Sequence, residues 1–117
     1  MNYMLLLYSE ADAGPAAGSP EQAAEMPAWF AFGDALTEAG AMVAGEALHA
    51  TETATTLRVR DGKRITTDGP FAETKEVLGG FYIIDVADID EAMKWAEKVP
   101  CAPYGTVEIR PVMEIPG

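Results

Sequence analysis

The chain has 117 residues and a mass of 12.5 kDa, which supports a single domain over residues 1–117 with one hydrophobic core. Its 8 Lys and Arg side chains stand against 19 Asp and Glu, so the net charge is −11. This balance argues against binding to nucleic acid or to an anionic membrane surface, because both need clustered basic side chains. The expected partners are a small neutral or cationic molecule or a basic protein.

The apolar run at residues 3–8 is too short to span a bilayer, and it has neither the flanking charge nor the cleavage pattern of a signal peptide. The single Cys101 permits no internal disulfide, which fits a reducing compartment. We therefore expect a cytoplasmic protein. With one His and one Cys, a Cys₂His₂ zinc site is impossible, and we expect neither a metal nor a cofactor.

The first half of the chain predicts a strand, a helix and a second strand. Residues 3–8 are apolar without alternation, which is typical of a central strand buried on both faces. Ser19 and Pro20 mark a helix start, and Pro27 predicts either a kink or a later start. The predicted apolar stripe, which ends at Gly40, contains Met26, Trp29, Phe30, Gly33, Leu36 and Thr37. Within residues 41–48, Met42 and Val43 suggest a short strand, with Gly45 as a bulge or a point of close approach.

The second half predicts a hairpin, a strand, a helix and a last strand. Residues 55–60 and 63–67 flank Asp61 and Gly62, a strong two-residue hairpin signal. Residues 81–86 form the next strand. Asp88 caps a helix that ends before Pro100, and residues 106–110 alternate as a strand.

This order predicts an α+β fold: a ferredoxin-like βαββαβ sandwich with an inserted β-hairpin. Two helices of this length cover only one face of such a sheet. The doubly apolar first strand indicates that the other face is apolar too, and a second copy of the chain is the simplest cover for it. We therefore expect a homodimer.

One motif stands apart from these elements: Asp68, Gly69, Pro70 and Phe71, which directly follow the hairpin. The plainer interpretation is a turn, in which Asp68 caps, Gly69 takes a backbone angle closed to other residues, and Phe71 packs into the core. The functional interpretation is a rigid loop that presents the Asp68 carboxylate at the mouth of a cleft.

With this motif the sequence resembles the YCII-related proteins of the DGPF subgroup. The resemblance covers almost the whole chain. Besides residues 68–76 it rests on Tyr3–Leu6, Trp29, Ala39–Gly40, Gly45–Leu48, Gly79–Gly80, Asp90–Ala92, Trp95–Ala96 and Gly105–Pro111.

The resemblance implies a dimeric α/β barrel, in which two ferredoxin-like sheets pack face to face. Some YCII relatives are dehydrochlorinases that act on chlorinated hydroquinones, with a suspected His–Asp dyad. Some proteins with the motif occur beside or fused to extracytoplasmic-function sigma factors. The dyad itself does not carry over, because the family His position falls at Trp29 and the Asp position near Glu38.

The candidate catalytic residues are Asp68, as general acid or base, and His49. A surface histidine after the second strand is the plainer interpretation of His49, and a turn cap is that of Asp68. Trp29 is read as a packing residue, and Cys101 as a small apolar filler. The candidate ligand-binding residues are Gly69, Pro70, Phe71, Tyr8 and Arg110.

Two functions follow from these residues. The first is a cofactor-independent enzyme, with lyase, dehydrochlorinase or isomerase chemistry on a small aromatic or related compound. The second is a non-catalytic module that senses a ligand, or that binds a basic protein such as a sigma factor through its acidic surface.

Overall fold

The computed structural model describes residues 1–116, which form one main sheet, two α-helices and a separate β-hairpin. The strands are β1 (Asn2–Glu10), β2 (Met42–Ala47), β3 (Thr55–Arg60), β4 (Lys63–Asp68), β5 (Glu76–Asp85) and β6 (Thr106–Pro111). The helices are α1 (Pro20–Glu38), α2 (Ile89–Glu97) and a short 3₁₀ helix (Thr51–Thr53).

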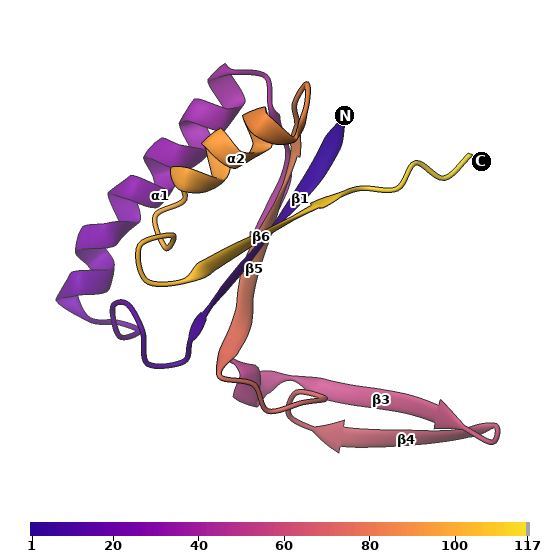
Figure 1. The fold of residues 1–117 in the computed structure, drawn as a ribbon. Coiled ribbons are helices and arrows are strands. Elements are labelled where there is room, and N and C mark those ends of the chain that lie inside the picture. Colours follow the sequence, from indigo (N-terminus) through magenta and orange to yellow (C-terminus); the bar gives the residue numbers. More distant parts are fainter. Residues whose placement is uncertain (117) are drawn as a thin grey trace.

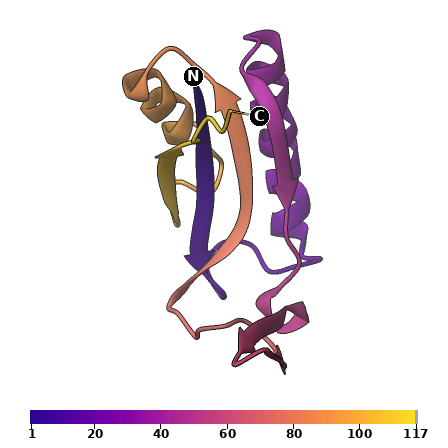
Figure 2. The ribbon, with the colours of Figure 1, turned by 90° about the vertical axis from the view of Figure 1, so that its right-hand side faces the viewer.

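The main sheet has the strand order β2-β5-β1-β6, and all its neighbours are antiparallel. Both helices pack on one face of this sheet, as Figures 1 and 2 show from two sides. Leaving out the hairpin, the elements follow the order β1-α1-β2-β5-α2-β6, which is ferredoxin-like. The predicted α+β fold with an inserted hairpin is therefore confirmed.

β1 runs through the centre of the sheet, as predicted. Tyr3, Leu5 and Leu7 face the helices and are buried against Leu36 and Ile84, both of which have no exposed surface. The alternate residues of β1 point to the other face and are only half-buried: Met4, Leu6 and Tyr8. The prediction of burial on both faces is therefore wrong for a single chain, because nothing among residues 1–116 covers the second face.

α1 begins at Pro20, where the Ser19 Oγ accepts a hydrogen bond from the Gln22 backbone N–H at 3.1 Å. Pro27 lies within the helix and does not end it. The predicted stripe is wrong at Phe30, which is 65% exposed while Phe32 is buried instead. Two residues correspond to roughly 200° around a helix axis, so only one of these rings can face the sheet. Two further residues of the stripe, Met26 and Thr37, are exposed as well.

α2 is short and is capped as the sequence predicted. The Asp88 Oδ1 accepts a hydrogen bond from the Glu91 backbone N–H at 2.9 Å. Its buried side is made of small residues, Ala92 and Ala96, which let the helix lie close to β6 and β1. Among residues 1–116 no helix combines the length and apolar character that a membrane span needs.

The β3–β4 hairpin, Thr55–Asp68, projects away from the main sheet and is called the arm below (Figure 1). Its turn uses Asp61 and Gly62, with φ angles of 52° and 72°, as the sequence predicted. The two strands pair only with each other. The radius of gyration is 16.3 Å, against roughly 13 Å for a compact domain of this length. The rest of the described chain is called the body.

Candidate functional site

A groove lies between the N-terminal half of α1 and the main sheet. It consists of two adjoining cavities of about 380 Å³ and 250 Å³. Four residues line both cavities: Leu7, Gln22, Trp29 and Gly79. We call this space the α1 groove. The larger cavity is also lined by Met26, Gly45, Glu46, Ala47, Gly80 and Tyr82, and the smaller one by Ser9, Ala13, Pro15, Glu25, Cys101 and Tyr104.

Glycines on β2 and β5 form the floor of the larger cavity. A Cβ atom on Gly45 would lie 2.6 Å from the ring of Tyr82, and one on Gly80 would lie 2.8 Å from the Glu46 carbonyl oxygen. Side chains at these positions would force the strands or the ring to move. The glycines therefore let β2 approach β5 closely while the space below α1 stays open.

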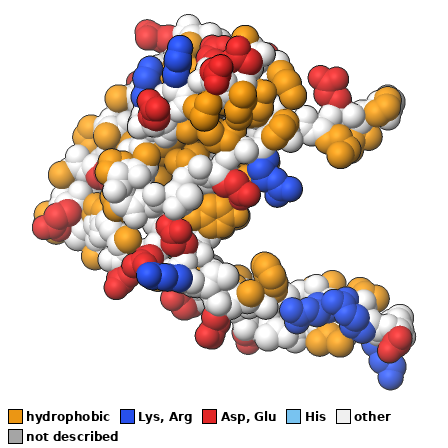
Figure 3. Space-filling view, in the orientation of Figure 1, with side chains coloured by type: hydrophobic (Ala, Val, Ile, Leu, Met, Phe, Trp, Pro, Cys, Tyr) orange, Lys and Arg blue, Asp and Glu red, His pale blue; other side chains and the backbone are white. Residues whose placement is uncertain are grey.

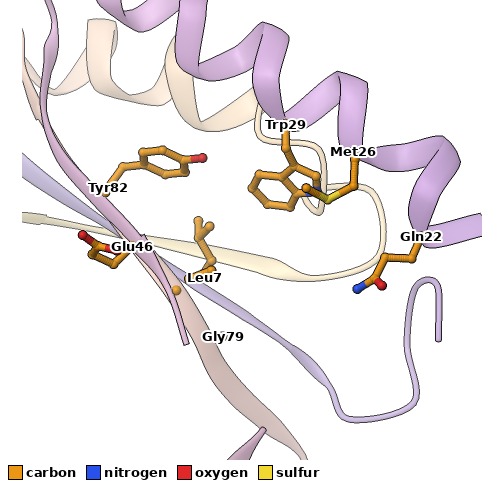
Figure 4. Close-up of a pocket in the computed structure, with 10 residues that line it drawn as sticks. Leu7, Gln22, Met26, Trp29, Glu46, Gly79 and Tyr82 are labelled. Atoms are coloured by element: carbon orange, nitrogen blue, oxygen red, sulfur yellow. The ribbon is translucent and has the colours of Figure 1, made fainter. Parts of the chain in front are cut away.

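The wall of the larger cavity is aromatic and apolar. Trp29 and Met26 descend from α1, while Tyr82 and Leu7 rise from the sheet toward them (Figure 4). Tyr82 packs edge-to-face on Phe32, with 5.1 Å between ring centroids. Partial burial raises the pKa of the Tyr82 hydroxyl, so it stays protonated at neutral pH and can donate a hydrogen bond.

The smaller cavity has a polar end. The Tyr104 hydroxyl donates a hydrogen bond to Glu25 Oε1 at 2.8 Å. Partial burial, followed by the bond to Glu25 and its negative charge, raises the pKa of Tyr104 far above its ordinary value. The Tyr104 ring lies directly against Gly14, where a Cβ atom would come within 2.6 Å of the ring. The absence of a side chain at Gly14 therefore makes room for Tyr104.

Cys101 lies at the same end and is buried. Burial, opposed by a backbone hydrogen bond and reinforced by the charge of Glu25, raises the pKa of its thiol. A thiol held in the protonated form is a poor nucleophile. This agrees with the interpretation of Cys101 as a small apolar filler.

The predicted catalytic residues lie outside the groove. Asp68 is the exposed last residue of β4, and His49 is exposed in the segment after β2. No hydrogen bond or ion pair within residues 1–116 joins them. Gly69, Pro70 and Phe71 follow at the base of the arm, where Phe71 is 77% exposed instead of packing into the core.

The two remaining predicted ligand residues lie on the sheet face away from the helices. Tyr8 is paired with Thr106, and Arg110 with Met4. Their face is opposite that of Leu5 and Leu7, which point toward the helices. The structure therefore separates the predicted residues into two places, the base of the arm and the uncovered sheet face.

Sequence reasoning missed the residues that line the groove. The sequence predicts helix packing for Trp29 and Met26, because a stripe at helical spacing is the ordinary pattern of a core-facing helix. Glu25 and Tyr104 gave no sequence signal, because they lie 79 positions apart and meet only through the fold. No group of three or more His, Cys, Asp or Glu side chains that could hold a metal is found in the described part of the chain.

The YCII-related domain model matches residues 1–116. The chain belongs to the YCII-related family. It is also 39% identical over 114 residues to an uncharacterised protein of Rhizobium meliloti (strain 1021), an alignment that covers 96% of this chain and 92% of that protein. Neither comparison assigns an activity.

Within this YCII-related chain, the family dyad has no counterpart in the groove. Trp29, at the expected His position, lines both cavities. Glu38, near the expected Asp position, is the exposed last residue of α1 and lines neither. A histidine at this position could take up or release a proton, whereas the indole ring of Trp29 offers only an aromatic surface.

Proposed function

We propose that this YCII-related protein binds a small, flat, largely apolar molecule of the aromatic class in the α1 groove, and that it does so as a homodimer. The observation that carries the proposal is the position of Trp29, which lines both cavities. Its ring, with Met26 and Tyr82, offers a surface on which an aromatic ring can stack. A volume of about 380 Å³ is at the lower end of the range for small-molecule sites.

The charges around the groove favour a neutral or cationic ligand. The Glu25 carboxylate lines the smaller cavity, and none of the residues that line either cavity is Lys or Arg. A hydroxyl or amine of the ligand can donate a hydrogen bond to Glu25, and a ligand acceptor can accept one from the Tyr82 hydroxyl. A ligand carboxylate would meet negative charge without a cation to pair with.

Ligand binding without catalysis fits the residues of the groove better than lyase or isomerase chemistry does. Trp29 has no group that titrates near neutral pH, and Cys101 and Tyr82 hold their protons. An enzyme with Asp68 as acid or base is the second candidate, and the exposure of Asp68 beside Phe71 favours it. An Asp68→Asn protein that folds, dimerises and loses turnover of a bound aromatic compound would favour the enzyme.

Calorimetric titration with hydroquinone, its chlorinated derivatives and benzoate tests the binding proposal. We expect the neutral compounds to bind more tightly than benzoate, and Trp29→Ala to weaken binding at least tenfold. Phe30→Ala is the matched control, because Phe30 is 65% exposed and does not line the groove. Unchanged binding by Trp29→Ala, or no binding of any compound to the parent protein, would contradict the proposal.

The uncovered sheet face supports the homodimer. Leu6 lies at its centre, between Phe81 on β5 and Glu108 on β6. Leu6 and Phe81 are only half-buried, together with the other apolar residues of this face: Met4, Tyr8, Leu78 and Ile83. A contiguous apolar face of this kind is typical of an interface, and a second copy would bury it symmetrically.

Sedimentation equilibrium of a Leu6→Lys variant tests the dimer. A lysine there can pair with Glu108 within the chain, but a dimer interface would have to bury both charged groups in apolar surroundings, which carries a large desolvation cost. We expect the parent protein to be a dimer at micromolar concentration and Leu6→Lys to be a folded monomer. Phe30→Lys, on the outer side of α1, should remain dimeric. A monomeric parent protein would refute this part of the proposal.

The acidic surface also favours a basic protein, such as the sigma factor suggested by the resemblance, as a further partner. If the contact is electrostatic, binding should weaken steeply between low and high salt. A flat salt response, measured on a purified sigma-factor partner, would remove this candidate.

A further inference from the structure

The arm has the opposite charge to the body. Half of the chain's 8 basic side chains lie on it: Arg58, Arg60, Lys63 and Arg64. Asp61 and Asp68 are its only acidic residues, which leaves the other seventeen of 19 on the remaining chain. Figure 3 shows blue side chains along the arm and mainly red ones among the charged residues of the body. The arm is therefore a cationic element on a strongly acidic protein.

The arm is also poorly covered by its own chain. Leu57 and Val59 are 52% and 57% exposed, and their cross-strand partners place them on one face of the hairpin. No ion pair within residues 1–116 involves a basic side chain of the arm. An isolated two-stranded hairpin is marginally stable in water, so this arm gains most from a surface outside its own chain.

The Asp68–Phe71 motif joins the arm to β5 and ties down its base. The Gly69 N–H donates to the Ala54 carbonyl at 2.6 Å, and the Thr56 Oγ1 donates to the Gly69 carbonyl at 2.8 Å. Gly69 has a φ of +99°, in the region that favours glycine. These bonds connect the chain entering the arm to the chain leaving it, and so close the base of the arm.

The arm projects to the side of the main sheet that faces away from the helices (Figures 1 and 2). The arm and the uncovered sheet face thus form two walls of one recess, visible in the outline of Figure 3. A second copy seated on the sheet face would lie beside the arm. Its body is acidic, and the arm that reaches it is basic.

We propose that the arm is an intersubunit clasp, which docks on the acidic body of a second copy and is closed at its base by the Asp68–Phe71 motif. The inference rests on the proposed dimer. Charge complementarity selects a second copy as the occupant, because every copy carries both the basic arm and the acidic surface. The pair of arms makes the contact symmetric, as a twofold dimer requires.

Photo-crosslinking tests the clasp directly. A benzophenone amino acid at Val59 should give a covalent dimer on a denaturing gel, whereas the same group at Ile89 on α2, also exposed, should not. In the Leu6→Lys monomer the crosslink from position 59 should disappear. A parent dimer without this crosslink, or a crosslink only to another protein or to nucleic acid, would overturn the clasp.

A charge series separates the clasp from the sheet-face dimer. Arg58→Gln with Arg60→Gln removes two charges from the arm, and Lys94→Gln with Lys98→Gln removes two from the region of α2. At low salt we expect the arm variant to raise the dimer dissociation constant at least tenfold and the control to raise it less than twofold. Equal effects would overturn the clasp even if Leu6→Lys confirms the dimer, whereas a monomeric parent protein would overturn both.

Discussion

The body and the arm differ in how far each buries its own side chains. The body buries Leu5, Leu36 and Ile84 completely between sheet and helices. In the arm, β4 is exposed along its whole length and β3 has one half-buried residue, Thr56. The body has the core that makes a domain stable alone, whereas the arm has correct turn chemistry but no core.

This difference indicates where each region obtains its stability. The body is stabilised by burial of apolar surface within one chain. The arm is stabilised locally by its turn and by the bonds at Gly69, and in our proposal also by a second copy. The same sequence therefore encodes a domain with its own core and an arm without one.

The largest effect should come from truncating the core. In the Leu6→Lys monomer, Leu36→Ala should lower the free energy of unfolding by about 2–5 kcal/mol, because Leu36 has no exposed surface and leaves a cavity. Leu57→Ala on the arm should change it by about 0.5 kcal/mol or less. Chemical denaturation measures both, and similar losses for the two variants would break the distinction.

A smaller effect should come from the tight approach of β2 and β5. A Cβ on Gly80 would lie 2.8 Å from the Glu46 carbonyl oxygen, whereas one on Gly79 would come no closer than 3.9 Å to its nearest neighbour. Gly80→Ala should therefore cost about 1–3 kcal/mol. The matched Gly79→Ala should cost clearly less in the same denaturation experiment. An equal cost would mean that the strands relax freely around the floor of the groove.

The smallest effect concerns the pH dependence of the body. The pKa of Tyr104 is raised by burial and by Glu25, so the folded protein holds this proton more tightly than the unfolded chain. This contribution is fully present below about pH 10, the ordinary pKa of tyrosine, and is lost as the pH rises further. Between about pH 8 and about pH 11, a range that brackets this pKa, the free energy of unfolding, measured by chemical denaturation, should fall less steeply with pH for Tyr104→Phe than for the parent protein. An unchanged slope would show that Tyr104 does not contribute to this pH dependence of stability.

Local signals predicted most of the fold. Alternation in residues 55–60, the Asp61–Gly62 turn and the Asp88 cap each act over a few residues, and the structure contains the elements they predict. The wrong predictions concern which side chains of an element face the core and which face solvent. Phe30 and Phe32 are both aromatic, but Phe32 lies four residues before the buried Leu36 and packs edge-to-face on Tyr82 and Trp95, so it is the one that faces inward.

The site was less accessible to sequence reasoning than the fold. Four of the seven predicted site residues form the unusual motif at residues 68–71, and the structure gives Gly69 a role in holding the base of the arm. The α1 groove forms because glycines of β2 and β5 meet below a helix from another part of the chain. Such a space depends on tertiary packing, and no local spacing encodes it.

Hydrogen exchange of the parent dimer and of the Leu6→Lys monomer tests the division between body and arm most directly. In both proteins the amides of β1 and β5 should remain protected, because their bonds lie within one chain. The amides of β3 and β4 should be protected in the dimer and exchange at least tenfold faster in the monomer. Equal protection of the arm in the two proteins would contradict its dependence on a second copy.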